Sequence, residues 1–433
     1  MHFPSLDQWL AWLETLHPRE IDLGLARVRR VWNRLGAPAP APHVVTVGGT
    51  NGKGSSVAFL EAILTAAGQR VGAYTSPHLL RYNERVRVAG EEVEDGLLCE
   101  AFARVDAARE DVSLTYFEFG TLAALDIFAR ADLDVALLEV GMGGRLDAVN
   151  IVDADVVLVT AVALDHQAWL GSDREAIGYE KAGIFRPARP AVISDPDPPA
   201  SLIGQARTMG TPLFRIGHEF HYDRPREGAV WHWRGAGQSL DGLPLPALDG
   251  DWQLQNAAGA LMVVERLDPV LPVDRAAIER GLRTVRVPGR CQRFLVDGVS
   301  WMVDVAHNPH AAAALADLLL REAVQGKTHA VCAVLADKDV AGICRAMAPV
   351  VDVWHIAGLD VARGAPATVL GEALASVGVP APQVHASVES ACAAAAARTG
   401  SGDRIVVFGS FHTAASVLPL LAEAVFGVQS DSP

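Results

Sequence analysis

The sequence predicts an α/β fold with a parallel-rich sheet, followed by a second, smaller α/β domain. Short apolar runs, among them residues 44–47, 135–138 and 156–164, alternate with segments of helical periodicity. This alternation is typical of parallel strands joined by helices. The same pattern starts again after Val287, from which we predict one domain over residues 1–286 and another over residues 287–433.

Composition and charge narrow the class of protein. With 433 residues, half of them hydrophobic, the chain can bury large cores in two or three domains. Acidic residues outnumber basic ones by 51 to 37, which argues against a general binder of nucleic acid or anionic membranes. The N-terminal segment lacks the order of a signal peptide, and the apolar runs are too short to span a bilayer. Five scattered cysteines indicate reduced thiols, so we expect a cytoplasmic location.

The clearest motif is VVTVGGTNGKGSS, at residues 44–56. Its valines suit a buried strand, and the following VAFLEAILTAAG suits a helix. The glycines allow backbone amides to approach an anion, while Lys53 and the helix N-terminus add positive charge. Ser55 or Ser56 could offer a hydroxyl to magnesium. We therefore predict a loop that binds nucleotide phosphates. The alternative is a glycine-rich turn with a surface lysine, because the spacing departs from GxxxxGK(S/T).

Polar residues follow the other predicted strands. Glu139 ends one strand after four apolar residues, and His166 follows the next. Ligands collect outside the carboxyl ends of parallel strands, and a buried carboxylate needs a cation. A metal-associated role is one interpretation of both residues. An ion pair of Glu139 with Arg145 and a structural role for His166 are the alternatives.

Nine segments together resemble the folylpolyglutamate synthase/dihydrofolate synthase family of the Mur ligase superfamily. They are GGTNGKGSS, TSPHLLRYNERVRV, TYFEFGTLAAL, LEVGMGGRLDAVN, VALDHQAWLG, YEKAGIF, PGRCQ, DVAHNPHA and FGSFHTAA, in that family's order over nearly the whole chain. The resemblance implies a Mur-ligase-like phosphate-loop domain with a parallel-rich sheet and a smaller Rossmann-like C-terminal domain. It also implies an active site between the two.

The chemistry implied by the resemblance is an ATP- and magnesium-dependent amide ligation; a monovalent cation is left open as a further cofactor. A substrate carboxylate would take the γ-phosphoryl group of ATP, and the amino group of L-glutamate would then displace phosphate from the acyl phosphate. Because two anions must meet, the site has to neutralise phosphoryl charge. Lys53, magnesium and Arg290 would supply the positive charge.

The resemblance also implies roles for individual residues. Those implied in catalysis are Lys53, Lys181, His166 and His307. Those implied to bind ATP are Thr50, Asn51, Gly52, Lys53, Gly54, Ser55, Asn256, Arg290 and Asp304. The implied magnesium ligands are Ser76, Glu139 and His166. The implied substrate-binding residues are Asp22, Leu23, Gly24, Arg81, Thr115, Tyr116, Phe117, Glu118, Leu146, Asp147, Ala148 and Ser410. For His307 and Ser410, a cap or turn role is the alternative.

Lys181 matches the lysine that this family carries as a carbamate. Carbon dioxide would convert an ammonium that repels magnesium into a carboxylate that helps to position it. Only a neutral amine reacts in this way, so partial burial would help. The ordinary interpretations are a lysine that extends along apolar surface or a partner of Glu180.

Three segments bear on the substrate. IDLGL, TYFE and LDA resemble the pterin-binding segments of bacterial bifunctional members, which make dihydrofolate from dihydropteroate and then extend reduced folates with glutamate. They favour a bifunctional enzyme over one that only extends folates. The acidic balance of the chain and the absence of a distinctive interface motif are compatible with a monomer. The alternatives are a folylpolyglutamate synthase only, another Mur-type amino-acid ligase, or a switch that hydrolyses ATP without ligation.

Overall fold

The computed structural model describes residues 3–225, 229–379 and 381–430, and the chain divides into two compact units. The first unit comprises Met1–Ala163, Gln167–Ala247 and Gln253–Arg286. The second comprises Leu164–His166, Leu248–Trp252 and Val287–Pro433. Within the described residues, no helix combines the length and the apolarity that a membrane crossing needs.

The first unit is built on an eight-stranded sheet. Its strands are β1 (His43–Gly48), β2 (Val71–Tyr74), β3 (Val86–Val88), β4 (Glu91–Glu92), β5 (Val135–Glu139), β6 (Val156–Val159), β7 (Ala191–Ile193) and β8 (Leu213–Arg215). Across the sheet they lie in the order β4-β3-β2-β5-β1-β6-β7-β8. The strands from β2 to β8 in this order are parallel, whereas β3 and β4 extend one edge as antiparallel strands. The central strands are buried, as their apolar runs predict.

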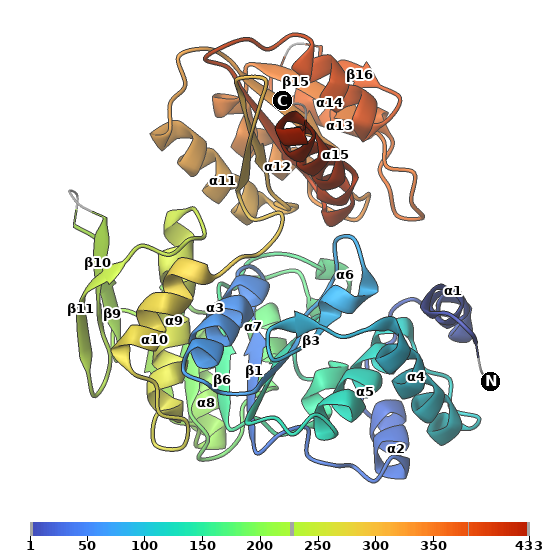
Figure 1. Ribbon diagram of the computed structural model, residues 1–433, viewed down its shortest axis with the longest axis vertical. Helices are drawn as coiled ribbons and strands as arrows, with labels where there is room; N and C mark the ends of the chain where they lie inside the picture. The colour runs from blue at the N-terminus through green and yellow to red at the C-terminus, as the bar shows by residue number, and fades with distance from the viewer. Residues whose placement is uncertain (1–2, 226–228, 380, 431–433) are drawn as a thin grey trace. The chain divides into compact units, whose positions relative to one another are not determined.

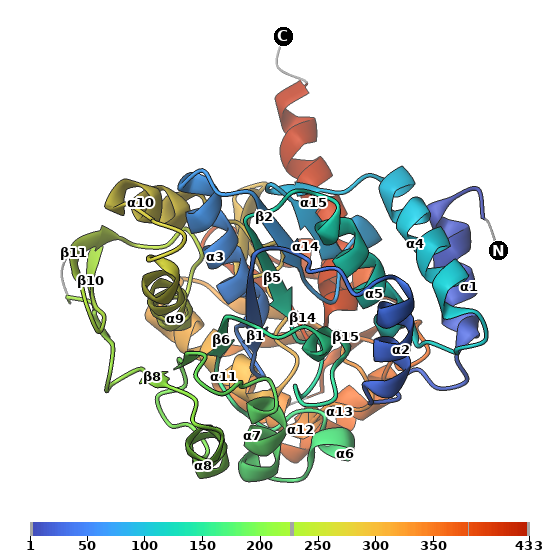
Figure 2. The same cartoon turned by 90° about the horizontal axis from the view of Figure 1, so that it is seen from below.

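Helices cover this sheet. They are α1 (Leu6–Leu16), α2 (Ala26–Arg34), α3 (Lys53–Ala66), α4 (Asp95–Arg109), α5 (Tyr116–Ala129), α6 (Gln167–Leu170), α7 (Arg174–Ala182), α8 (Ala200–Met209), α9 (Asp251–Leu267) and α10 (Arg275–Thr284), with the 3-10 turns η1 (Tyr82–Arg85) and η2 (Ala148–Ile151). Figure 1 shows α10 beside α3, which contacts β1, β2 and β5. Figure 2 shows α3 on one side of the central strands and α5 on the other, with α4 and α1 next to α5.

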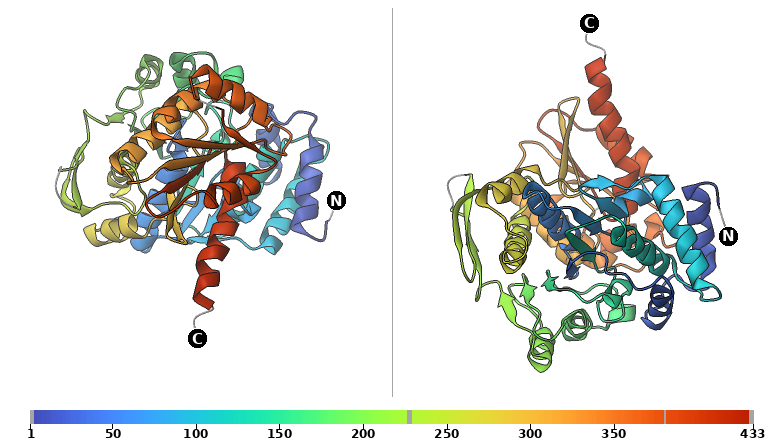
Figure 3. Two further views of the ribbon diagram at one scale, coloured as in Figure 1. Left: turned by 90° about the horizontal axis from the view of Figure 1, so that it is seen from above. Right: turned by 60° about the horizontal axis from the view of Figure 1, so that its bottom comes forward.

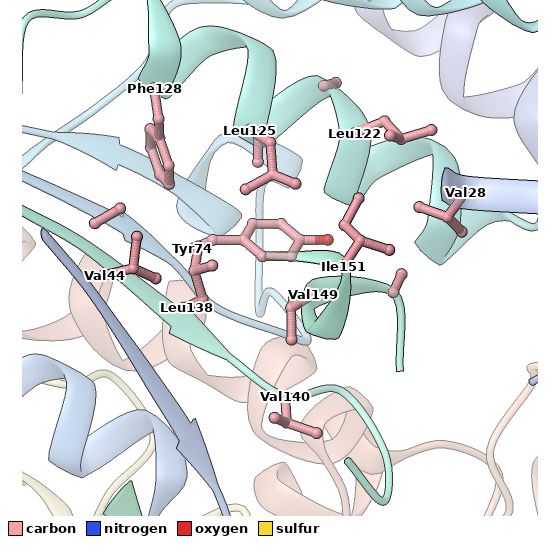
Figure 4. Packing of buried hydrophobic residues seen from close by; sticks show 14 of the residues in the cluster. Val28, Val44, Tyr74, Leu122, Leu125, Phe128, Leu138, Val140, Val149 and Ile151 are labelled. Carbon is pink, nitrogen blue, oxygen red and sulfur yellow. The ribbon is translucent and has the colours of Figure 1, made fainter. Parts of the chain in front are cut away.

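The core between the sheet and α5 surrounds Tyr74, the last residue of β2 (Figure 4). Leu125 of α5, Leu138 of β5 and Val149 of η2 lie around its ring. The buried phenol lies 3.2 Å from the hydroxyl of Thr121, and burial raises the pKa of Tyr74 to about 12. The end of β2 is thus held rigidly by packing and one polar contact.

A small antiparallel sheet of β9 (His221–Asp223), β10 (Val230–Arg234) and β11 (Ser239–Pro244) follows α8 and β8. Its central strand alternates exposed and buried residues, which is the pattern of a sheet with one face in solvent. Trp231 and Trp233 supply the buried face.

The second unit contains a six-stranded sheet. Its strands are β12 (Gln292–Val296), β13 (Val299–Val303), β14 (Thr328–Cys332), β15 (Val353–Ala357), β16 (Gln383–His385) and β17 (Arg404–Phe408), in the order β12-β13-β17-β14-β15-β16. Among the described strands of this sheet, only β12 is antiparallel to its neighbour. Its helices are α11 (Pro309–Arg321), α12 (Val340–Met347), α13 (Ala367–Ser376), α14 (Val388–Ala396) and α15 (Phe411–Ser430), with the 3-10 turn η3 (Ala348–Val350). Figure 3 shows the twisted strands of this sheet among its helices. The predicted α/β class with parallel-rich sheets is confirmed.

Candidate active site

A tight loop joins β1 to α3. Gly49 has a φ of 140° and Gly52 a φ of 93°, a region that glycine adopts without strain. A Cβ on Gly49 would overlap the hydroxyl of Thr160, and one on Gly52 would overlap the side-chain amide of Asn256. Gly52 is also the N-cap of α3, so the first amides of that helix face the loop. These amides and the helix dipole form a site suited to an anion.

The loop is tied to the segment that follows β6. Thr50 donates its backbone N–H to the carbonyl of Ala161 over 2.7 Å and its hydroxyl to the carbonyl of Ala163 over 3.0 Å. Lys53 Nζ donates to the carbonyl oxygens of Gly49 and Thr50, at 3.2 Å each. The ammonium group therefore lies over the loop whose amides it would assist.

Two residues of α9 complete the loop. Gln253 Nε2 donates to Ser55 Oγ over 3.4 Å, and Asn256 Nδ2 donates to Gln253 Oε1 over 3.0 Å. All three side chains are buried. Of the other predicted ATP-binding residues, Gly54 lies in the first turn of α3 and Asn51 forms an isolated antiparallel bridge. Sequence reasoning missed Gln253, although its spacing of three from Asn256 puts both on one helix face.

Glu139 and Ser76 meet where β5 and β2 end. Cα pairing of Val47 with Glu139 puts this carboxylate at the edge of the sheet where the phosphate loop begins. Glu139 is 5% exposed, and its Oε2 accepts a hydrogen bond from Ser76 N over 3.1 Å. The guanidinium of Arg145 pairs with Glu180, at 2.9 Å. A buried carboxylate beside a serine offers the oxygen ligands that magnesium prefers, so these two residues fit a divalent cation.

His166, the third predicted metal ligand, groups with the second unit. Its φ is 51°, and its backbone N–H donates to its neighbour Asp165 over 2.8 Å. Within the described part of the chain, no three histidine, cysteine or acidic side chains converge as a metal site. The ligand set of Ser76, Glu139 and His166 stays a prediction.

Asp165 is the centre of a polar cluster in the second unit. Its carboxylate accepts a hydrogen bond from Lys338 Nζ over 2.7 Å and one from Asn308 Nδ2 over 3.3 Å, and lies 3.5 Å from His307 Nε2. Burial opposes ionisation of Asp165, but the hydrogen bond of His307 and the charges of His166 and Lys338 outweigh it and lower its pKa. Sequence reasoning missed Lys338, because a lysine in a polar loop carries no distinguishing pattern.

Three predicted residues of the second unit, Arg290, His307 and Ser410, lie close to Phe411 in space or in sequence. The guanidinium of Arg290 is 5.3 Å from the centre of its ring, and the ring of His307 is 5.9 Å away. Ser410 precedes Phe411, and its hydroxyl accepts the backbone N–H of Thr413 over 2.9 Å. That contact is the helix-cap role considered as the alternative for Ser410. Phe411 itself was not predicted.

Asp304 follows β13 and is hydrogen-bonded on both oxygens. Oδ2 accepts the backbone N–H of Cys291 over 2.9 Å, and Oδ1 accepts that of Ala306 over 2.7 Å. The carboxylate therefore organises its own loop, and its predicted contact with nucleotide stays a prediction.

The TYFE and LDA segments both lie in the first unit. The ring of Phe117 packs so closely on Gly141 that a Cβ there would overlap it. Asp147 accepts the backbone N–H groups of Met142 and Val149, at 2.9 and 3.1 Å. Burial raises the pKa of Asp147 to about 6, although these amides and the charge of Lys53 act in the opposite direction. The buried carboxyl of Asp147 thus lies within reach of the charge of Lys53 in the phosphate loop.

Other predicted substrate residues lie beside Phe117 and Asp147 in the sequence or elsewhere in the first unit. Leu146 and Ala148 flank Asp147, and Ala148 is buried. Tyr116 begins α5, and the guanidinium of Arg85 lies 5.5 Å from the centre of its ring. Arg81 is the N-cap of η1 and reaches out to Asp95, at 3.3 Å, with its side chain mostly in solvent.

The IDLGL segment is joined to TYFE by a residue that the sequence did not single out. Arg27, in the first turn of α2, pairs with Asp22 over 2.8 Å and with Glu118 over 2.9 Å. Leu23 and Gly24 lie between Asp22 and this helix. Thr115 caps α5 in a reciprocal capping box with Glu118.

Lys181 lies near the end of α7 and is 2% exposed. Its burial does not fit a side chain that extends to solvent, and Oε1 of Glu180 pairs with Arg145. The carbonyl oxygens of Glu180 and Lys181 crowd Gly144, where a Cβ would lie 2.9 and 3.0 Å from them. The carbamate stays a prediction.

A glycine-rich loop on a parallel sheet, followed by a second α/β unit, defines a class of protein that the family comparisons identify. The Mur ligase middle domain matches residues 47–263, and the glutamate ligase domain of Mur ligases matches residues 289–411. The chain therefore belongs to the Mur ligase family.

Individual relatives narrow the family. The dihydrofolate synthase/folylpolyglutamate synthase of Escherichia coli K12 is 46% identical over 96% of this chain and 95% of its own length. Among solved structures, E. coli FolC in complex with DHPP and ADP has a TM-score of 0.91 at 46% identity, covering 96% of this chain and 98% of that chain. A bifunctional folylpolyglutamate synthase/dihydrofolate synthase with Mn, AMPPNP and L-glutamate bound has a TM-score of 0.89 at the same identity and coverage. Within the Mur ligases, this chain is a member of the dihydrofolate synthase/folylpolyglutamate synthases, which confirms both the predicted family and the predicted ligase class.

Proposed function

We propose that this enzyme uses ATP and magnesium to join L-glutamate to dihydropteroate, giving dihydrofolate, and to reduced folates, giving folylpolyglutamates. The central support is the convergence in one unit of the phosphate loop, the Glu139–Ser76 pair and the TYFE and LDA segments. The charge of Lys53 in the loop lowers the pKa of Asp147 in LDA, so these two side chains are close enough to interact electrostatically. The γ-phosphate of ATP and the carboxylate of the pterin-containing substrate would have to meet in such a place.

Each group of residues has a task that its geometry suits. The amides at the start of α3 and the Lys53 ammonium would bind the phosphates and stabilise charge on the transferring phosphoryl group. Glu139 and Ser76 would hold the divalent ion, which supplies further positive charge when bound. The buried carboxyl of Asp147 would accept hydrogen bonds from the pteridine, and Phe117 would offer a ring face.

The substrate carboxylate would take the γ-phosphoryl group, and the glutamate amine would displace phosphate from the acyl phosphate. We assign contact with the incoming glutamate to His307. The carbamate of Lys181, the ligand role of His166 and the nucleotide contacts of Arg290 and Asp304 belong to the same proposal. The five unpaired cysteines support a reducing compartment, the cytoplasm, and we propose that the enzyme acts there as a monomer.

The decisive experiment incubates the protein with ATP, magnesium and labelled glutamate, with dihydropteroate and tetrahydrofolate in separate tubes. Labelled product in both tubes is the expected result. Product with tetrahydrofolate alone would reject dihydrofolate synthesis. Phosphate release that is indifferent to glutamate would reject ligation altogether and indicate a nucleotide switch.

A further inference from the structure

Arg27 contacts two segments that lie far apart in the chain. Nη1 donates to Asp22 Oδ2 over 2.8 Å, and Nη2 donates to the carbonyl oxygen of Asp22. On the other side, Nη2 donates to Glu118 Oε1 over 2.9 Å and Nε donates to Oε2 over 3.4 Å. One planar guanidinium thus ties Asp22, near the start of IDLGL, to the first turn of α5, where Glu118 lies 91 positions after Arg27.

Buried Glu118 depends on Arg27 as its charged partner. The residue is 4% exposed, and its Oε2 also accepts the backbone N–H of Thr115 over 2.8 Å. Without Arg27, Oε1 would lose its charged donor in a buried position, which the capping box alone cannot compensate. The carboxylate therefore depends on α2 for its partner, and the start of α5 depends on the carboxylate.

The residues next to Asp22 and Glu118 in the sequence are predicted to bind the substrate. Leu23 and Gly24 directly follow Asp22, and Tyr116 and Phe117 directly precede Glu118. Fixing Asp22 against Glu118 therefore fixes the backbones that carry both pairs. The ring of Phe117 is further located by its close packing on Gly141.

We infer that Arg27 is a positioning residue for the pteridine half of the substrate, because it holds the Leu23–Gly24 and Tyr116–Phe117 segments in register with each other. This role rests on the proposed function. Arginine suits it because its rigid fork reaches two carboxylates and a carbonyl at once, whereas a lysine ammonium acts as a single point charge. Arg27→Lys therefore keeps the charge and removes the bridge.

Arg34 provides a matched control on the same helix. Its guanidinium pairs with Glu110 at 3.1 Å and donates to the carbonyl oxygens of Ala108 and Arg109, at 3.2 and 2.8 Å. It is likewise an α2 arginine that bridges to another segment, but that segment carries none of the proposed substrate residues. Arg34→Lys tests for the general cost of weakening the attachment of α2.

The test compares steady-state kinetics of wild type, Arg27→Lys and Arg34→Lys, with dihydropteroate varied at saturating ATP and glutamate, and ATP affinity measured separately. Arg27→Lys should raise the KM for dihydropteroate about tenfold or more, since small misplacements of binding groups have effects of this size. Its ATP affinity should stay within about twofold of wild type, because no nucleotide contact changes. Arg34→Lys should leave both values unchanged.

Each other outcome has one meaning. An unchanged KM for dihydropteroate in Arg27→Lys beside an active wild type overturns the role of Arg27 alone. If Arg27→Lys loses ATP affinity by the same factor as its KM for dihydropteroate rises, Arg27 is a general stabiliser of the unit and the proposed role is overturned. The same holds if Arg34→Lys raises the KM for dihydropteroate as much as Arg27→Lys does. A wild-type enzyme that makes no product from dihydropteroate overturns the proposed function instead.

Discussion

Replacing Gly52 with alanine tests the geometry of the phosphate loop. Gly52 caps the N-terminus of α3 with a φ of 93°, and an added Cβ would overlap Asn256 Oδ1. Asn256 is buried and hydrogen-bonded to Gln253 over 3.0 Å, so its amide cannot move aside without losing that bond. The substitution therefore acts on the backbone and on a neighbour from α9.

The size of the effect has two parts. A left-handed backbone costs an alanine about 1–2 kcal/mol. Displacing the Asn256 amide and leaving a buried polar group unsatisfied costs about 1–3 kcal/mol more. Gly68, just beyond the other end of α3, isolates the first part, because its φ is 86° and nothing lies within 4 Å of an added Cβ.

Urea denaturation and calorimetric titration with ATP would measure both variants. We expect Gly68→Ala to lower the free energy of unfolding by about 1–2 kcal/mol with an unchanged Kd for ATP. Gly52→Ala should lower it by about 2–5 kcal/mol and weaken ATP binding at least about tenfold, because relieving the overlap with Asn256 would shift the loop backbone whose amides are proposed to bind phosphate. Equal destabilisation of the two variants, with ATP affinity intact in both, would refute the reasoning.

Three buried ionisable groups give further predictions. Asp147, whose pKa is raised to about 6, loses its charge below that pH, so kcat/KM for dihydropteroate should fall on acidification. Asp147→Asn should abolish this acid limb, and an identical limb in the variant would contradict the assignment. Lys181 should give a carbamate carbon signal after equilibration with carbon-13-labelled bicarbonate; a spectrum identical to that of Lys181→Arg would rule the carbamate out. His355, stacked between His329 and His385, has its pKa lowered to about 4 by burial and by those neighbours. Since the unfolded chain then binds more protons, stability should fall as the pH drops from 6.5 to about 4. His355→Gln should reduce this slope in urea denaturation, and an unaltered slope would contradict the burial of a neutral imidazole.

Local patterns along the chain predicted the main elements. β1 and α3 flank the glycine loop at 49–52, and β5 ends at Glu139 after its four apolar residues, because strand burial and helix entry depend on residues close in sequence. The same patterns predicted a phosphate site at this loop, since glycines, one lysine and a helix N-terminus are chemically sufficient to suggest it. Motif order over the whole chain identified the family.

Only the tertiary structure decided which distant side chains support these segments. Gln253 reaches Ser55 across 198 positions, and Arg27 reaches Glu118 across 91. Periodicity reports which face of a helix or strand is buried, but it does not report which residue of another element lies opposite that face. That choice follows from strand order, helix placement and the directional demands of hydrogen bonds in a buried setting, all of which exist only once the chain has folded.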